Sequence, residues 1–455
     1  MKKIVYMPIE TQSRELNARI ALGHSLVDEE VSVLIADQQY IRANASKIKS
    51  SVYFGKHLFG KPRFQDRNLY DKLKKNMNSV IYLSEEGGIW AGDEKDWKIL
   101  LERIEKPDLF EEDDIYCTWG EWQLQFANRA YELKCKSAVT GSPKFTILSD
   151  KFDFLYERAR SKYNEKYGDY ILINTAYSVY NGLGGAEGWF GQLLNWGGSF
   201  DEKLKFGMNK YIQQAHTVNS ILELVFNLAS TLKDQNFIIR PHPSENHDFY
   251  RAVFKYLDNV HIIYEGSANE WIAGSKLLIQ SGCTTGIEAA FMNKPVVNWS
   301  PTYTRNMAEV KIVQSTGYTA QSIEEVMDIM NGKLEPKDLR KLPKDYEDTK
   351  LLENLNGIDS IRAIEDIISE VIDKKFKLYT WLPSRFTALR HKIYLRSKEI
   401  YYLISGNSEK IGDHEKRFGV FEREEIVGKV NSFNEAFGKN VAVSYLDKYG
   451  FVLEK

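Results

Sequence analysis

The chain has 455 residues, more than a single hydrophobic core usually organises, so at least two domains are expected. Its composition, 43% apolar and 27% charged, is typical of a globular protein, and 61 basic against 63 acidic residues leave no general attraction to nucleic acid. The three cysteines, Cys117, Cys135 and Cys283, have no CxxC spacing, which argues against disulfides and against a cysteine zinc site.

The sequence also lacks a targeting or membrane-spanning pattern. No run approaches 18 consecutive apolar residues, and the opening MKKIVYMPIETQSRE becomes polar too early for a signal peptide. We therefore expect a cytoplasmic protein.

The first half of the chain alternates short apolar runs with helical patterns. KIVYMPI is predicted to be a strand, SRELNARIALGHSLVDE a helix and VSVLIA a second strand, which together make a βαβ unit. SVIYL and DIYCTWG are predicted to be further strands, and EWQLQFANRAYELKC follows as a helix. The stretch TWGEWQ supplies aromatic residues that could line a pocket for an acceptor substrate. This half is predicted to be a parallel α/β domain.

The second half repeats the same logic after a charged helix near residues 150–169. YILINTA, NFIIR, NVHIIY, KLLIQ and KPVVNW have the composition of buried strands, and helical segments separate them. We predict an acceptor domain at residues 1–165, a nucleotide-sugar-binding domain at 166–345, and a helical tail at 346–455 that packs on the N-terminal domain or on a membrane. The predicted fold class is therefore α/β and GT-B-like, with two doubly wound Rossmann-like domains facing a central cleft and a C-terminal helical tail.

The segment LLIQSGCTTGIEAAFMNKPVV, residues 277–297, is the most informative motif. A strand ends at Gln280, a turn rich in glycine and hydroxyl groups follows, and a helix begins near Ile287. Such a turn can present backbone N–H groups and threonine hydroxyls to an anion, and Glu288 in the first helical turn can accept both hydroxyls of a ribose. The alternative interpretation is an ordinary helix start with a favourable glutamate.

A second motif, IIRPHPSEN, places His242 between two prolines just after a strand. The prolines restrict the backbone, and a histidine held in this way can donate to a phosphate oxygen of a leaving nucleotide. Arg240 either adds a positive charge or faces the core, and Glu245 is expected to cap or orient. A purely structural turn is the alternative.

Two loops complete the set of candidate positions. Glu85 and Glu86 lie after a predicted strand and before two glycines, where a carboxylate can act as a general base or a nucleophile, or remain a solvated loop residue. Asn174 and Thr175 end the first strand of the second domain and either bind ligand or cap the loop. Sequence motifs typical of metalloproteases, P-loop kinases and serine hydrolases are missing.

These motifs resemble the bacterial surface carbohydrate biosynthesis proteins, a family related to the β-Kdo transferases. The resemblance rests on MPIETQSRELNARIALG, YFGKHL, LSEEGG, WGEWQ, VTGSPKF, ILINTAY, RPHPSEN, the segment from EGSANEW to NKPVV, and HEKRFGVF. It implies a GT-B fold and a metal-independent, CMP-dependent glycosyltransferase without a cofactor. The donor would carry a Kdo-like or nonulosonic acid, and the acceptor would be a capsule or lipopolysaccharide glycan, free or lipid-linked.

Carried onto this chain, the resemblance implies that His242 contacts the CMP phosphate and that Glu288 binds the ribose. Ser281, Thr284 and Thr285, with Gly282 between them, would bind the phosphate or the donor carboxylate. Arg240 and Asn174 complete the expected nucleotide-sugar site, and Glu85 or Glu86 would be the acidic catalytic residue, together with His242.

The chain departs from the family in one respect, because NTAYSVYN offers no aspartate for the nucleophile that retaining β-Kdo transferases use. The alternatives are a CDP-glycerol-type polyol-phosphate transferase, a UDP-sugar enzyme on the same fold, and a non-catalytic scaffold that binds nucleotide sugars.

Residues 374–405 are basic and aromatic. Such a segment can lie on an anionic membrane as a peripheral contact, or it can pack back onto the first domain.

Overall fold

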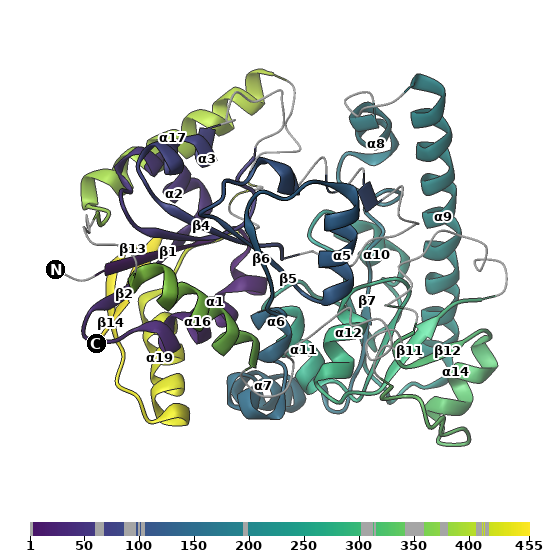
Figure 1. Ribbon diagram of the computed structural model, residues 1–455. Coiled ribbons are helices and arrows are strands. Elements are labelled where there is room, and N and C mark those ends of the chain that lie inside the picture. Colours follow the sequence, from purple (N-terminus) through teal and green to yellow (C-terminus); the bar gives the residue numbers. More distant parts are fainter. Residues whose placement is uncertain are drawn as a thin grey trace. The chain divides into compact units, whose positions relative to one another are not determined.

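The computed structural model describes residues 3–59, 68–85, 97–98, 101, 105–193, 199–301, 313, 315–341, 359–373, 381–405, 412, 414 and 418–455. The chain forms two compact units: the first combines residues Met1–Leu155 with Glu347–Lys455, and the second spans Tyr156–Tyr346. Each unit is an α/β domain built on its own sheet (Figure 1). The boundary lies ten residues before the junction placed from the sequence, because helix α7 (Glu157–Tyr167) packs on α11 (Ala268–Gly274) of the second unit.

The first unit contains an eight-stranded sheet in the order β13-β14-β2-β1-β3-β4-β5-β6. Its strands are β1 (Lys3–Ile9), β2 (Val31–Asp37), β3 (Val52–Gly55), β4 (Ser79–Leu83), β5 (Ile115–Thr118), β6 (Lys136–Val139), β13 (Ala442–Asp447) and β14 (Gly450–Glu454). Strands β1 to β6 are parallel, and the chain reverses its direction of travel across the sheet between β1 and β3. Strands β2, β3 and β4 are buried along their whole length, as expected for a parallel sheet covered on both faces.

Helices cover both faces of this sheet. They are α1 (Gln12–Leu26), α2 (Gln38–Ala43), α3 (Asn68–Lys75), α5 (Glu121–Ala130), α6 (Pro143–Thr146), α16 (Asp359–Asp373), α17 (Arg385–Ile404) and α19 (Arg423–Phe437), with 3-10 turns at Ala45–Lys47, Pro107–Leu109 and Asp150–Leu155. Helix α1 contacts α6, α16 and α19, so segments from the two ends of the chain share one layer.

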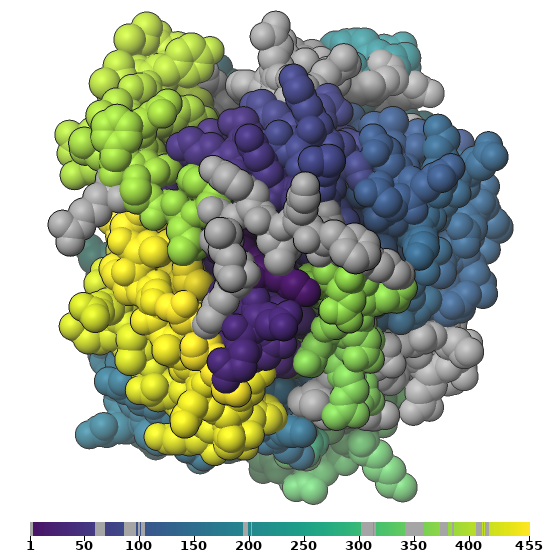
Figure 2. Space-filling model, turned by 60° about the vertical axis from the view of Figure 1, so that its left-hand side comes forward, coloured from purple at the N-terminus to yellow at the C-terminus, as the bar shows by residue number. Residues whose placement is uncertain are grey.

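The sequence predicts a purely helical C-terminal tail. The structure differs, because the C-terminal segment also contributes two strands to the first sheet. Strand β14 pairs antiparallel with β2, and β13 pairs with β14 as a hairpin. The sequence pattern missed the hairpin because its two strands are short and follow a long helical region. In Figure 2 the C-terminal residues, in yellow, lie side by side with N-terminal residues, in purple.

The second unit has a six-stranded parallel sheet in the order β12-β11-β10-β7-β8-β9. Its strands are β7 (Ile171–Asn174), β8 (Phe237–Arg240), β9 (Val260–Ile262), β10 (Leu277–Gln280), β11 (Val296–Trp299) and β12 (Tyr318–Ala320). Numbered within the unit, the order is 3-2-1-4-5-6, which is the Rossmann arrangement. The predicted fold class, with two doubly wound Rossmann-like domains, is confirmed.

Two apolar layers sandwich this second sheet. Ile171 and Ile173 pack on one side with the long helix α9 (Phe200–Thr231), whereas Leu172, between them, packs on the other with Trp271 of α11. The described part of this unit also contains the helices α8 (Gly185–Leu193), α10 (His247–Val253), α12 (Thr285–Phe291) and α14 (Ile323–Met330).

We expect the C-terminal hairpin to be essential for the first unit. Phe451 on β14 is fully buried and contacts Phe421 edge to face, so Phe451→Ala should destabilise the unit by about 3–5 kcal/mol. Urea unfolding followed by circular dichroism measures this change. Tyr256→Ala, at a position that is 86% exposed, serves as the control. Equal stability of the two variants would contradict an integral role for the hairpin.

Candidate functional site

The candidate site begins with a row of polar side chains at the carboxyl end of the second sheet. Asn174 ends β7 and stands in register with Gln280 of β10 on one side and Arg240 of β8 on the other. The chain changes direction across the sheet between β7 and β10, and open α/β sheets bind ligands outside the strand ends at such a reversal. The two motifs found in the sequence therefore follow strands that flank the same central strand, about 10 Å apart.

A buried glutamate organises the loop after β8. Glu245 is fully buried and accepts hydrogen bonds from the backbone N–H of His242 (2.9 Å), the hydroxyl of Thr175 (2.8 Å) and the hydroxyl of Tyr250 (2.5 Å). Thr175 follows β7, whereas Tyr250 lies on α10. One carboxyl group thus ties the end of the central strand to the proline-flanked histidine and to the next helix.

The imidazole of His242 has a defined orientation. Its Nδ1 lies 2.6 Å from the hydroxyl of Ser244 and accepts the backbone N–H of the same residue at 3.3 Å. In the neutral ring this assigns the proton to Nε2, which makes that nitrogen the hydrogen-bond donor. The two prolines and the Glu245 contact hold the backbone, and Ser244 holds the ring.

The glycine-rich turn after β10 is fastened to its own strand. Gln280, fully buried, accepts the backbone N–H of Cys283 at 2.6 Å and also pairs with Asn298 of β11. Gly282 has a φ of +75° and open space where a Cβ would stand, so its backbone is accessible at the tip of the turn. The hydroxyl of Thr285 donates to the sulfur of Cys283 at 3.0 Å.

Helix α12 begins at Thr285, two residues before the start near Ile287 that the sequence pattern indicated. It has only seven residues, about two turns, so its dipole contributes little to anion binding. Ser281 and Thr284 are half-buried, and Glu288 in the first turn is 6% exposed. The turn therefore offers hydroxyl groups more than it offers a helix terminus.

Asn174 is the feature of this edge that most needs a partner. Its side chain is 3% exposed, and neither its amide nitrogen nor its oxygen has a hydrogen-bond partner within the described part of the chain. Buried amides without partners are rare because each unmade hydrogen bond costs free energy. The Asn174 amide lies between the His242 loop and the 281–286 turn.

Arg240 is committed to a structural role in its own loop. Its guanidinium donates to the carbonyl oxygens of Glu265 (2.6 Å) and Gly266 (2.5 Å) and lies over the ring of Tyr264. Burial lowers the pKa of this guanidinium. Among the two roles considered from the sequence, the geometry favours the structural one.

The candidate acid of the first unit lies in a charged cluster at the ends of β1, β3 and β4. Glu85 forms an ion pair with Arg19 at 2.8 Å, and its side chain is 14% exposed. Lys56 pairs with Glu15 at 3.0 Å and with Glu10 at 3.3 Å. Glu86 lies outside the described residues.

The electrostatics of this cluster keep Lys56 charged. Burial lowers the pKa of its ammonium group, but the carboxylates of Glu15, Glu85 and Glu10 together raise that pKa above its ordinary value. The reversal of strand order between β1 and β3 places the cluster where a Rossmann-like sheet binds ligands. The sequence signal that could have revealed it is the spacing of Glu15 and Arg19, four residues apart on a helix face that is otherwise apolar.

The predicted residues thus fall into three groups. The first group lies at one edge of the second sheet and consists of Asn174, His242, Ser281, Gly282, Thr284, Thr285 and Glu288. Arg240 is directed into the adjacent loop. Glu85 stands in the first unit. Trp119 of the TWGEWQ stretch, expected to line an acceptor pocket, is instead fully buried against Phe145.

No family model matches this sequence, and no curated protein matches it. Solved structures with a similar fold include the UDP-GlcNAc 2-epimerase of Methanocaldococcus jannaschii in complex with UDP-GlcNAc and UDP, at 12% identity and a TM-score of 0.45, covering 81% of this chain and 100% of that chain. A putative UDP-N-acetylglucosamine 2-epimerase from Listeria monocytogenes matches at 12% identity and 0.48, covering 84% and 100%. The Anabaena protein HepE in complex with UDP and glucose matches at 10% identity and 0.40, covering 82% and 100%. Likeness at this level carries no information on the substrate of this chain.

We expect Glu245 to make the stability of the second unit depend on pH. Burial raises the pKa of its carboxyl above the ordinary value of 4.5, against the opposing effect of its hydrogen bonds. A raised folded-state pKa contributes stability that is complete below pH 4.5 and is lost as pH rises through the folded pKa, at about 1.4 kcal/mol per pKa unit. Glu245→Gln removes this titration.

Urea unfolding of the wild type and of Glu245→Gln between pH 4.5 and 8 checks the expectation. The wild type should lose stability relative to the variant as pH rises, whereas Glu187→Gln, at an exposed position, should leave the pH profile unchanged. A difference between wild type and Glu245→Gln that is the same at every pH would show that the carboxyl does not titrate differently in the folded state.

Proposed function

We propose that this chain is an enzyme of bacterial surface-glycan assembly that binds a nucleotide sugar at the carboxyl ends of β7, β8 and β10 and transfers the sugar to a glycan acceptor. The observation that carries the proposal is the buried amide of Asn174, without a hydrogen-bond partner among the described residues, at the point where the strand order reverses. A phosphate or ribose hydroxyl at this position would supply the missing hydrogen bonds.

The neighbouring groups divide the recognition of such a ligand between them. His242, with Nδ1 accepting the Ser244 amide, donates its Nε2 proton to a phosphate oxygen and stabilises charge on the departing nucleotide. The hydroxyls of Ser281, Thr284 and Thr285 bind the phosphate or the donor carboxylate, and Gly282 lets the ligand approach the backbone. Glu288 accepts the ribose hydroxyls.

Two classes of donor suit this set of groups, because CMP and UDP share a pyrimidine, a ribose and a phosphate. A CMP donor with a Kdo-like or nonulosonic acid follows from the family resemblance. A UDP-sugar enzyme or a CDP-glycerol-type polyol-phosphate transferase is the alternative. The site features address the phosphate and ribose that these donors have in common, so titration with CMP and UDP separates the cytidine donors from the uridine donors.

Glu85 is the proposed acidic catalytic residue of the first unit, and Glu86 stays a prediction. The ion pair with Arg19 at 2.8 Å fixes the orientation of the Glu85 carboxylate, and a general base has to be held in this way. Replacing it should reduce turnover without reducing nucleotide binding in the second unit. A scaffold without catalytic activity would bind the nucleotide but would not cleave a nucleotide-sugar donor, so no free nucleotide would be released.

We expect His242→Ala to weaken nucleotide binding by about 10- to 100-fold, because a hydrogen bond to a charged phosphate contributes about 1.5–3 kcal/mol. Isothermal titration with CMP, UDP and GDP measures it. Asn174→Ala should weaken binding of the same nucleotide. His216→Ala, which replaces an exposed histidine on α9, should leave that binding unchanged. Donor turnover should fall about 10²- to 10⁴-fold in Glu85→Gln with binding retained.

Failure of the wild type to bind any of the three nucleotides, or unchanged binding in both His242→Ala and Asn174→Ala, would refute the nucleotide site. Binding without turnover in the wild type would instead favour the scaffold.

The tail segment predicted to contact a membrane is described from residue 381 onward, and residues 374–380 lie outside the described part. Helix α17 packs on the first unit through a narrow stripe that includes Thr387 and His391. Its opposite face exposes large apolar side chains at helical spacing: Phe386, Leu389, Ile393, Ile400 and Ile404, which are 54–82% exposed. Exposed basic residues, Arg390, Lys392 and Arg396, flank this stripe.

We propose that this face of α17 lies on an anionic bilayer, where the acceptor lipid would be found. The apolar stripe suits the acyl boundary, and the basic residues suit anionic headgroups. Among the described residues, no helix is long and apolar enough to cross a bilayer. In Figure 2 the residues of α17, in lime, form a corner of the surface at the upper left.

Vesicle sedimentation tests the membrane contact. The wild type should bind vesicles that contain phosphatidylglycerol and should be released as salt is raised. Ile400→Glu combined with Ile404→Glu should abolish binding, whereas Phe226→Glu, a comparably exposed position on α9, should not. Equal binding by the double variant and the wild type would refute the contact.

A further inference from the structure

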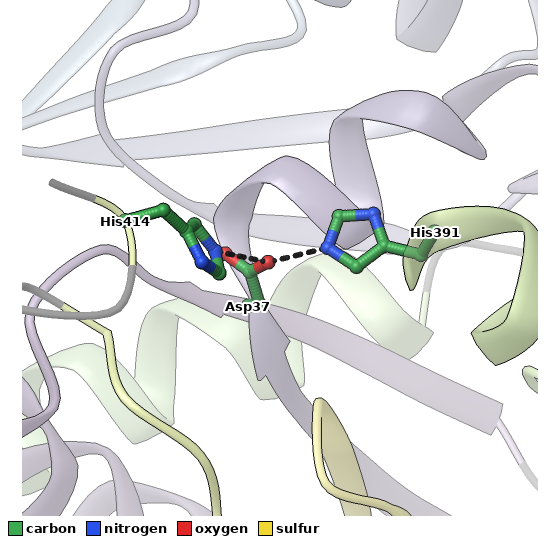
Figure 3. A group of neighbouring side chains, drawn as sticks. All are labelled: Asp37, His391 and His414. Atoms are coloured by element: carbon green, nitrogen blue, oxygen red, sulfur yellow. Dashed lines mark hydrogen bonds and ion pairs between the residues drawn. The ribbon is translucent and has the colours of Figure 1, made fainter. Parts of the chain in front are cut away.

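Three side chains that the proposed function does not use converge on one point in the first unit. Asp37 ends β2, His391 lies on α17, and His414 comes from the segment between α17 and α19. The Oδ2 atom of Asp37 lies 2.8 Å from Nε2 of His391 and 2.9 Å from Nε2 of His414 (Figure 3). The three atoms all lie within 4.8 Å of one another.

This cluster is enclosed. Asp37 is 1% exposed and His391 is 3% exposed, whereas the side chain of His414 is 18% exposed. Aromatic rings surround the imidazoles: Tyr40 and Tyr449 lie 5.0 and 4.7 Å from the His391 ring, between centroids. The other carboxylate oxygen of Asp37 is held by the backbone N–H of Gln39 at 3.0 Å, so the carboxylate orientation is fixed.

We propose that Asp37, His391 and His414 form a binding site for a divalent transition-metal ion, with Zn²⁺ as the preferred ion. Two imidazole nitrogens and one carboxylate oxygen are a ligand set that zinc takes, with a fourth position left for water or an anion. Tetrahedral bonds of about 2.0–2.1 Å place ligand atoms about 3.3 Å apart. The two imidazole nitrogens, now 2.8 and 2.9 Å from Oδ2 of Asp37, therefore have to move away from that oxygen by about 0.5 Å when one ion binds.

The surroundings contribute both for and against the ion. His414 lines a pocket of about 250 Å³, which gives an access path. The pocket is also lined by four basic residues, Lys392, Arg396, Lys398 and Lys448, and by one acidic residue, Glu399. This lining opposes a cation and favours an anion as the fourth ligand. Coordination through Nε2 moves the ring proton of His391 to Nδ1, which is buried and has no hydrogen-bond partner among the described residues.

A metal ion here would cross-link three segments that are far apart in the chain. It would join the end of β2 to α17 and to the segment at His414, and so fix α17 on the first unit. The site lies in the first unit, whereas the proposed nucleotide site lies in the second, so the two proposals can fail independently.

The experiment uses the full chain after treatment with EDTA and gel filtration. Titration with Zn²⁺ against a chromophoric chelator should show one site per chain, with a dissociation constant of about 1 μM or tighter. Co²⁺ should give the intense visible absorption of four-coordinate cobalt, and Zn²⁺ should raise the melting temperature by a few °C.

Two ligand variants test the site: Asp37→Asn keeps the side-chain shape, and His414→Ala changes the least buried ligand. Each should weaken Zn²⁺ binding at least about 100-fold and remove the thermal shift. His216→Ala is the matched control and should bind as the wild type does. The proposal is overturned if the EDTA-treated wild type takes up no Zn²⁺ or Co²⁺, or if both ligand variants bind Zn²⁺ as tightly as the wild type. Either result would leave the cluster as a hydrogen-bonded clamp.

Discussion

The carboxyl group of Glu245 is the contact on which the candidate nucleotide site depends. It is fully buried, and it accepts hydrogen bonds from the end of β7, from the backbone of His242 and from α10. Burying a carboxyl is unfavourable unless hydrogen bonds compensate, so these contacts have to form together. The position of the His242 ring relative to Asn174 therefore follows from a group that has no chemical role of its own.

The sheet provides the second constraint, because its topology brings two motifs together that are about 40 residues apart in the chain. Chain order alone does not say whether β8 and β10 are neighbours. The Rossmann order places β7 between them, and the register aligns Arg240, Asn174 and Gln280 in one row. Had β10 been added beyond β9, the two motifs would flank β9, and Asn174 would not stand between them. The proposed site is thus a consequence of the direction reversal after β9.

Much of this could be predicted from local patterns. Alternating apolar strands and helices indicated two parallel α/β domains, and the PHP and SGCTTG stretches marked two strand ends. The missing information was of two kinds. The hairpin β13–β14 and the cluster of Asp37, His391 and His414 depend on pairing between the first forty residues and the last seventy, which no local pattern encodes. The commitment of Arg240 to the carbonyls of Glu265 and Gly266 depends on loop geometry, and so does the burial of Trp119.

The C-terminal segment shows how one stretch of chain can meet opposed requirements. Helix α17 buries only a narrow stripe and exposes apolar residues on its other side, so packing alone gives it limited stability on the first unit. His391 lies on the buried stripe and reaches Asp37, which is itself anchored at the end of a central strand. A specific polar or metal-mediated attachment on one face lets the other face remain apolar and outward. Such a division would suit the proposed membrane contact, because α17 is held by protein on one side only.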